Sequence, residues 1–229
     1  MTPTEMTAKL AAGNGFIAAL DQSGGSTPKA LAGYGVGDDA WSDEAGMYGL
    51  IHEMRSRIIR STAFTGDKVI GAILFERTMD GSVDSLPTPT ALIAKGVVPF
   101  IKIDKGLEAE ADGVQLMKPM PDLEALLDRA KALGVFGTKE RSVINESNPA
   151  GIAAIVAQQF EVARRVLAKG MMPIIEPEIS IKSATRAQCD TIAKAPQAYQ
   201  ARAELAEGLR SLVEADRPAV AYMKGDRMS

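Results

Sequence analysis

Short apolar runs alternate with amphipathic segments along most of the chain, and this alternation constrains the fold more than any other feature. We expect strands at the apolar runs 15–20, 69–75, 97–103, 135–138, 171–175 and 219–223. We expect helices at the amphipathic stretches 45–61, 122–132, 151–168 and 201–214, the third of them capped by Asn148 and Pro149. Parallel strands need a long crossover and are buried on both faces, so continuous apolar runs separated by helices predict a parallel sheet.

Two architectures repeat such strand–helix units, the doubly wound open sheet and the (β/α)8 barrel. A G-x-G-x-x-G loop after a strand would indicate a dinucleotide-binding open sheet, and no expected strand is followed by one. Gly13-Asn14-Gly15 precedes the first expected strand, which is the wrong side for that loop. Because 229 residues suffice for one domain with a large core, we expect a single α/β domain over residues 1–229.

Composition argues against several kinds of site. Cys189 and His52 are the single cysteine and the single histidine, so we expect no disulfide, no cysteine- or histidine-rich metal centre, and a Ser-His-Asp triad only if it uses His52. Lys and Arg number 26 against 29 Asp and Glu, a net charge of −3 without a basic footprint for nucleic acid. With no signal-peptide pattern and no apolar run near about 18 residues, we expect a cytoplasmic protein that does not enter a membrane.

Ionisable residues lie at or just after the carboxyl ends of the expected strands, which gather on one side of a parallel sheet. They are Asp21, Glu76, Arg77, Lys102, Asp104, Lys139, Glu140, Arg141, Glu176, Glu178 and Lys224. In a barrel these strand ends form the active-site face. A lysine among other cations in a partly desolvated mouth has a lowered pKa and can form a Schiff base with a carbonyl, while a second lysine and a carboxylate move protons.

Two segments stand out from ordinary strand-end charge, which by itself is typical of loops in any α/β protein. Lys102 and Asp104 are two residues apart in an apolar run, so they point to one face, where a lysine is costly unless it is paired. Asp21 is followed by Gln-Ser-Gly-Gly-Ser, whose hydroxyl and backbone N–H groups could bind an anion. A flexible turn is the alternative interpretation of that second segment.

These segments together resemble the class I fructose-bisphosphate aldolases of the bacterial type. The matching segments, in chain order, are GNGFIAALDQSGGS (13–26), IGAILFER (70–77), GVVPFIKIDKG (96–106), GVFGTKERSVI (134–144) and GMMPIIEPEI (170–179). The resemblance covers about residues 13–183 and implies a (β/α)8 TIM barrel. It also implies a metal-independent lyase that needs no cofactor and cleaves fructose 1,6-bisphosphate in glycolysis.

The resemblance further implies a role for each matching residue. Asp21 would orient the catalytic lysines and assist carbon–carbon cleavage. Lys139 would aid proton transfer, and Glu176 would be the general acid and base in Schiff-base formation, with Glu178 supporting its charge. The residues that would bind substrate or its phosphates are Ser23, Ser26, Lys102 and Arg141, with Asp104 supporting the lysines.

The C-terminal part departs from the family's pattern. Lys224 is the strand-end lysine at the right order to form the Schiff base, but its surroundings, Met-Lys-Gly-Asp-Arg, differ from the family's motif. We expect about six of the eight strand–helix units and a chain truncated or altered after about residue 183. Without the last two strands the sheet would expose edges, so a second copy of the chain could be needed to close it.

Three functions therefore stay open: the aldolase itself, a transaldolase-like Schiff-base enzyme, and a catalytically impaired fragment that binds sugar phosphate. In each case we expect the binding partner to be a small sugar phosphate. The sequence is compatible with a homo-oligomer and does not fix the oligomeric state.

Overall fold

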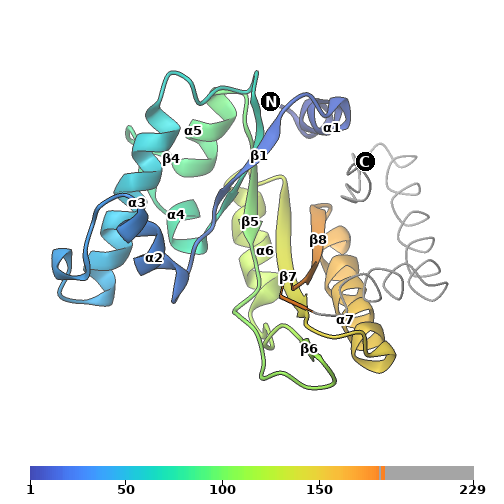
Figure 1. Ribbon diagram of the computed structural model, residues 1–229. Coiled ribbons are helices and arrows are strands. Elements are labelled where there is room, and N and C mark those ends of the chain that lie inside the picture. Colours follow the sequence, from blue (N-terminus) through green and yellow to red (C-terminus); the bar gives the residue numbers. More distant parts are fainter. Residues whose placement is uncertain (181, 184–229) are drawn as a thin grey trace. The chain divides into compact units, whose positions relative to one another are not determined.

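The computed structural model describes residues 1–180, 182 and 183 (Figure 1). The strand expected at 219–223, the helix expected at 201–214, and Lys224 and Cys189 lie outside these residues. The described residues divide into two compact units, Met1–Lys102 with Arg129–Phe136, and Ile103–Asp128 with the described residues from Gly137. The fold class is α/β, as the sequence predicts, while the organisation into a single domain stays a prediction.

The first unit is built on three parallel strands. β2 (Val69–Leu74) lies between β1 (Phe16–Leu20) and β5 (Val98–Lys102) and pairs with both in parallel. The crossovers between them carry α3 (Glu44–Arg60) and α5 (Thr88–Ala94). Since five of the six residues of β2 are buried, this central strand reads as a continuous apolar run.

The remaining elements of this unit are shorter. They are α1 (Pro3–Ala12), α2 (Ser26–Gly33), the 3₁₀ helix η1 (Asp38–Ala40), α4 (Glu76–Met79), β3 (Ser82–Val83) and β4 (Leu86–Pro87). α2 packs on α3 through a buried cluster of Leu31, Met47, Tyr48 and Ile51. α3 also contacts the loop that follows β1, because its Arg55 donates a hydrogen bond to the carbonyl of Gln22, next to Asp21.

The second unit contains a strand–helix–strand repeat. β7 (Gly137–Ile144) pairs in parallel with β8 (Met172–Ile179), and α7 (Pro149–Ala168) connects them (Figure 1). The short β6 (Val114–Gln115) pairs with β7 in the antiparallel sense. α6 (Leu123–Ala132) precedes β7, and its last turn, from Arg129, belongs to the first unit.

α7 begins as the sequence predicts. The Asn148 side chain accepts hydrogen bonds from the backbone N–H groups of Ala150 and Gly151, and Pro149 occupies the first turn. Ile152 and Ile155 on its buried face pack against Ile144 of β7. This packing fixes the helix over the strand that carries the charged residues of the site.

β7 and β8 are longer than predicted. The expected strands end at 138 and 175 because charged residues follow, whereas both observed strands continue through those residues and pair over eight positions. The extension is stable because cross-strand ion pairs accommodate the charges, which removes the cost of placing them in a sheet. Lys139, Arg141, Glu176 and Glu178 therefore lie within strands and not in the loops after them.

Among the described helices, none has the length and apolar character needed to span a membrane.

Candidate active site

Charged side chains of β7 and β8 in the second unit form a cluster, which we call the charged group. A lysine and a glutamate lie at its centre. Lys139 lies on β7 and Glu176 on the neighbouring strand β8. The Nζ atom of Lys139 is 2.8 Å from Oε2 of Glu176. The Lys139 side chain is 11% exposed and that of Glu176 43% exposed. An amine that is nearly buried is thus held against a carboxylate that still reaches solvent, an arrangement suited to moving a proton between a substrate and the pair.

A second pair repeats the first one step along the strands. Arg141 Nη1 donates to Glu178 Oε2 at 2.9 Å. Because side chains alternate along a strand, residues two apart share a face, so the two pairs form one row of alternating charge. Both members of the second pair are about four-tenths exposed, so its contribution to stability is small, and Arg141 stays accessible to an anion.

Glu140 points to the opposite side of β7 from its two neighbours. Its side chain is fully buried, and neither carboxylate oxygen has a hydrogen-bond partner in the part of the chain that the structure describes. Burial, reinforced by the nearby Asp104 and only partly opposed by Lys139, raises the pKa of Glu140 well above its usual range. Burial therefore favours the neutral form of this carboxyl.

Asp104 lies just after the end of β5, at the start of the second unit. It is buried, and its Oδ1 accepts a hydrogen bond of 3.3 Å from the backbone N–H of Gly106. Asp104 and Lys139 both act electrostatically on Glu140. Of the residues expected at the site, the structure pairs Lys139 with Glu176 and places Arg141 and Glu178 beside them on the same two strands.

The other expected residues lie in the first unit. Asp21 follows β1 directly and opens the loop that leads into α2. In that loop the backbone N–H of Ser23 donates to Ser26 Oγ at 2.9 Å, and Ser26 Oγ donates to the Ser23 carbonyl at 2.8 Å. The Ser26 hydroxyl therefore closes the turn, so a phosphate contact from it would have to replace a hydrogen bond.

Lys102 is the last residue of β5 and is half-buried. That Asp21 and Lys102 gather with Lys139 and Glu176 stays a prediction, and Lys224 lies beyond the described residues.

Two further strand-end charges take part in the packing of the first unit. Glu76 forms an ion pair with Arg129, which also bonds Asp80 at 3.2 Å, so the last turn of α6 is tied to α4. Arg77 lies over the ring of Tyr48, 4.3 Å from its centroid. These contacts explain why charged residues follow β2 without requiring a role in chemistry.

Sequence reasoning singled out no role for Glu140, although a signal was present. A charged residue between Lys139 and Arg141 on a strand points away from them, toward the helix that covers the sheet. A glutamate there is unusual because burial without a partner is costly. Extending the fourth expected strand beyond residue 138 and counting alternate positions along it would have found Glu140.

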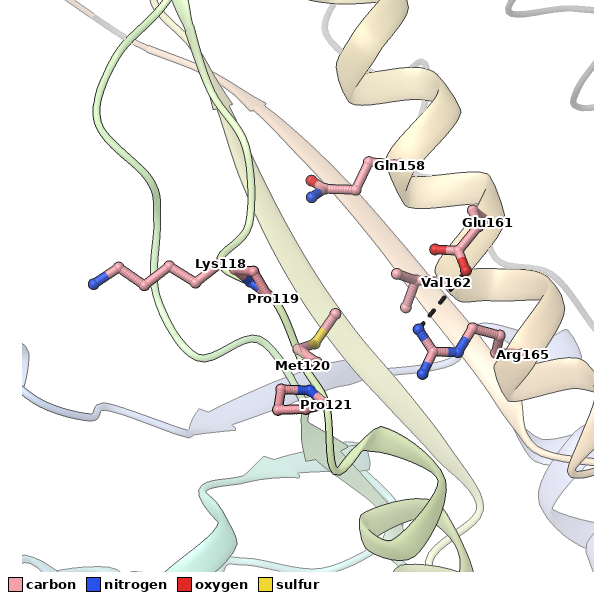
Figure 2. A pocket seen from close by; sticks show the side chains of 8 residues that line it. All are labelled: Lys118, Pro119, Met120, Pro121, Gln158, Glu161, Val162 and Arg165. Carbon is pink, nitrogen blue, oxygen red and sulfur yellow. Dashed lines mark ion pairs between the residues drawn. The ribbon is translucent and has the colours of Figure 1, made fainter.

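The described part of the second unit also contains an open cavity of about 380 Å³, shown in Figure 2. It lies between the segment Lys118–Pro121 and α7, and Gln158, Glu161, Val162 and Arg165 complete its lining. Gln158 holds one wall in place by bonding both the N–H and the carbonyl of Met117 at 2.9 Å. No residue expected at the site lines this cavity, so it is separate from the charged group. Within the described ranges, no set of three or more His, Cys, Asp or Glu side chains is placed to hold a metal ion.

Comparison with known proteins gives a consistent result. The family described as "Glycolytic: Fructose-bisphosphate aldolase class-I" matches residues 4–203. Among solved structures, fructose-bisphosphate aldolase from Plasmodium falciparum, in a complex with TRAP and a small-molecule inhibitor, superposes with a TM-score of 0.60 at 20% identity. That match covers 77% of this chain and 52% of the aldolase, so the chain spans about half the length of that relative. The match shows the fold, a (β/α)8 TIM barrel in part.

Two structures of the arginine decarboxylase of Paramecium bursaria Chlorella virus also match, both at 15% identity. The first has a TM-score of 0.34 and covers 96% of this chain and 61% of the decarboxylase. The second, bound to agmatine, has a TM-score of 0.28, with 84% and 58% covered. Superpositions this poor carry no argument about fold or function.

Proposed function

Because the chain belongs to the class-I fructose-bisphosphate aldolase family, we propose that it is a lyase that cleaves fructose 1,6-bisphosphate reversibly into dihydroxyacetone phosphate and glyceraldehyde 3-phosphate. The reaction proceeds through a lysine Schiff base, without a metal, as a step of glycolysis. The observation that carries the proposal is the pair of Lys139 and Glu176, 2.8 Å apart on neighbouring strands. A Schiff-base reaction needs such a site because several of its steps move a proton to or from an oxygen.

The first stage forms the covalent intermediate. The amine of Lys224 attacks the C2 carbonyl of the ketose, and the adduct is a carbinolamine. Glu176 donates the proton with which the former carbonyl oxygen leaves as water, and a cationic iminium remains. Lys139, held 2.8 Å from Glu176, is placed to aid this proton transfer.

The second stage breaks the carbon–carbon bond. A base removes the C4 hydroxyl proton, the C3–C4 bond breaks, and its electron pair passes into the iminium to give an enamine. Glyceraldehyde 3-phosphate leaves, C3 of the enamine is protonated, and water releases dihydroxyacetone phosphate from the lysine. Asp21 orients the lysines during cleavage.

The remaining residues hold the substrate. Lys102 and Arg141 supply positive charge for the phosphates and hydroxyls, Ser23 and Ser26 add hydroxyl or backbone donors, and Asp104 supports the lysines. The half-exposed state of Arg141 supports this role, since its guanidinium reaches solvent while paired with Glu178.

We also propose a cytoplasmic protein, organised as one domain, that binds a small sugar phosphate and neither nucleic acid nor a membrane. The net charge of −3 and the absence of a basic run support the exclusion of nucleic acid. A homo-oligomer is compatible with this proposal.

Borohydride reduction in the presence of dihydroxyacetone phosphate tests the chemistry. We expect a covalent adduct that mass spectrometry of the digested protein locates on Lys224. An adduct on Lys139 would favour a transaldolase-like enzyme. Sugar-phosphate binding with no adduct would favour the impaired, binding-only alternative.

A matched pair of substitutions tests the acid and base. We expect Glu176→Gln to lower kcat for cleavage by about 100-fold or more, because the amide cannot exchange the proton. Glu161→Gln, at an exposed position of α7 outside the charged group, removes a carboxylate that has no proposed role in catalysis and should leave kcat within about threefold. Equal kcat values for the two variants would contradict the role assigned to Glu176.

A further inference from the structure

Arg55 interrupts the buried apolar face of α3. Ile51, Arg55 and Ile59 are four residues apart, so they lie in one stripe along the helix, and each is at most 1% exposed. An arginine is the least expected residue in such a stripe, because removing a guanidinium from water is costly. An apolar residue of similar volume would pack there without that cost.

The guanidinium of Arg55 contacts the segments that follow two neighbouring strands, β1 and β2. Its Nη1 donates to Thr78 Oγ1 at 2.7 Å, in α4 directly after β2. Its Nη2 donates to the backbone carbonyl of Gln22 at 2.6 Å and lies 3.3 Å from Gln22 Oε1. Gln22 Nε2 in turn donates to the Ala19 carbonyl of β1 at 3.1 Å. The residue after Asp21 is thus held through both its backbone and its side chain.

The charge of Arg55 also bears on Asp21. Burial lowers the pKa of Arg55 to about 10, and the negative charge of Asp21 opposes this shift. Arg55 therefore remains protonated near neutral pH. The positive charge of Arg55 and the negative charge of Asp21 therefore attract each other.

We propose that Arg55 is a positioning residue that holds Asp21 and the loop after β1 in the arrangement needed for cleavage. This inference rests on the proposed function, in which Asp21 orients the lysines. The hydrogen bonds to Gln22 fix the backbone next to Asp21, and the contact with Thr78 anchors the guanidinium itself. A displacement of about 1 Å in such a group can cost about 100-fold in rate, so a buried anchor for Asp21 has a direct kinetic use.

Substitutions on one helix separate this role from general packing. Arg55→Met keeps much of the side-chain length but removes the charge and all donors. We expect it to lower kcat about 100-fold while KM changes less than about threefold, because Asp21 acts in the chemical step. Arg55→Lys keeps the charge and one donor group and should recover about tenfold of the loss. The control is Arg57→Met, since the Arg57 side chain is 74% exposed and pairs with Glu53; its kcat should be unchanged.

A double-mutant cycle with Asp21→Asn gives the deciding measurement. If Arg55 acts through Asp21, Arg55→Met lowers kcat by less than about twofold in the Asp21→Asn background, because there is no carboxylate left to position. If its effect is only structural, the two losses multiply. Multiplied losses, or wild-type kcat in Arg55→Met, overturn the inference and leave the proposed function intact.

Arg55→Met leaves Thr78 and Gln22 without their donor, so a milder variant accompanies it. Thr78→Val removes the anchor of Nη1 and retains the charge of Arg55. It should lower kcat severalfold, and this loss should also disappear in the Asp21→Asn background. The inference is overturned if Thr78→Val and Arg55→Lys, measured separately, both leave kcat at the wild-type value. Wild-type protein that neither cleaves the substrate nor forms a trapped adduct overturns the proposed function, and the inference falls with it.

Discussion

The fold opposes the ionisation of Glu140. Its carboxyl is fully buried on β7, and burial together with Asp104 raises its pKa well above the value of about 4.3 expected in an unfolded chain. The folded state therefore binds this proton more tightly than the unfolded state does. Consequently the free energy of unfolding decreases as the pH rises from about 4.3 through the raised pKa.

We expect Glu140→Gln to remove this decrease, because the amide has the same shape and does not titrate. Urea unfolding at about pH 5 and pH 8 should show that the variant gains stability relative to wild type by about 1 kcal/mol or more at the higher pH. Glu146→Gln, an exposed position just after β7, is the control and should leave the pH dependence unchanged. The same pH slope in wild type and Glu140→Gln would show that Glu140 ionises freely.

At the level of single elements, packing determines whether a glycine tolerates a larger residue, and two glycines of the first unit differ in this respect. A Cβ built on Gly66 would lie 2.3 Å from the carbonyl oxygen of Gly96, because the turns before β2 and β5 touch there. A Cβ on Gly49, an exposed position inside α3, meets nothing within 4 Å. The same substitution should therefore have opposite effects at the two sites.

Gly66→Ala should lower the free energy of unfolding by roughly 1–3 kcal/mol, because the two turns must move apart. Gly49→Ala should raise it by about 0.5–1 kcal/mol, since alanine loses less backbone entropy in a helix. Thermal unfolding followed by circular dichroism measures both. A destabilised Gly49→Ala or a neutral Gly66→Ala would contradict the packing described for these elements.

The elements also show what the sequence could and could not predict. Continuous apolar runs predict the strands β1, β2 and β5, and amphipathic spacing predicts the helices α3, α6 and α7. α1 was missed because it has only two buried residues, and its start depends on a capping box between Thr2 and Glu5. The lengths of β7 and β8 were underestimated because the ion pairs that stabilise their charged halves form only between strands.

At the level of the whole molecule, the proposed aldolase reaction would need residues of both compact units. Asp21, Ser23, Ser26 and Lys102 come from the first, whereas Asp104, Lys139, Arg141 and Glu176 come from the second. The sequence predicts these residues because each follows or ends an expected strand, and the carboxyl ends of parallel strands lie at one edge of a sheet. The proposal that the chain folds as a single domain has a thermodynamic consequence.

Trp41, the single tryptophan, packs on the buried cluster of α2 and α3 and therefore reports on the first unit. Ile155 is fully buried in the core of the second unit, against Ile144 and Ile152. Ile155→Ala should destabilise that core by about 2–5 kcal/mol. If the chain is one domain, the urea midpoint measured by Trp41 fluorescence should fall together with the midpoint measured by circular dichroism, because unfolding is all-or-none. A Trp41 midpoint that stays at the wild-type value while the circular dichroism shifts would mean that the units unfold separately.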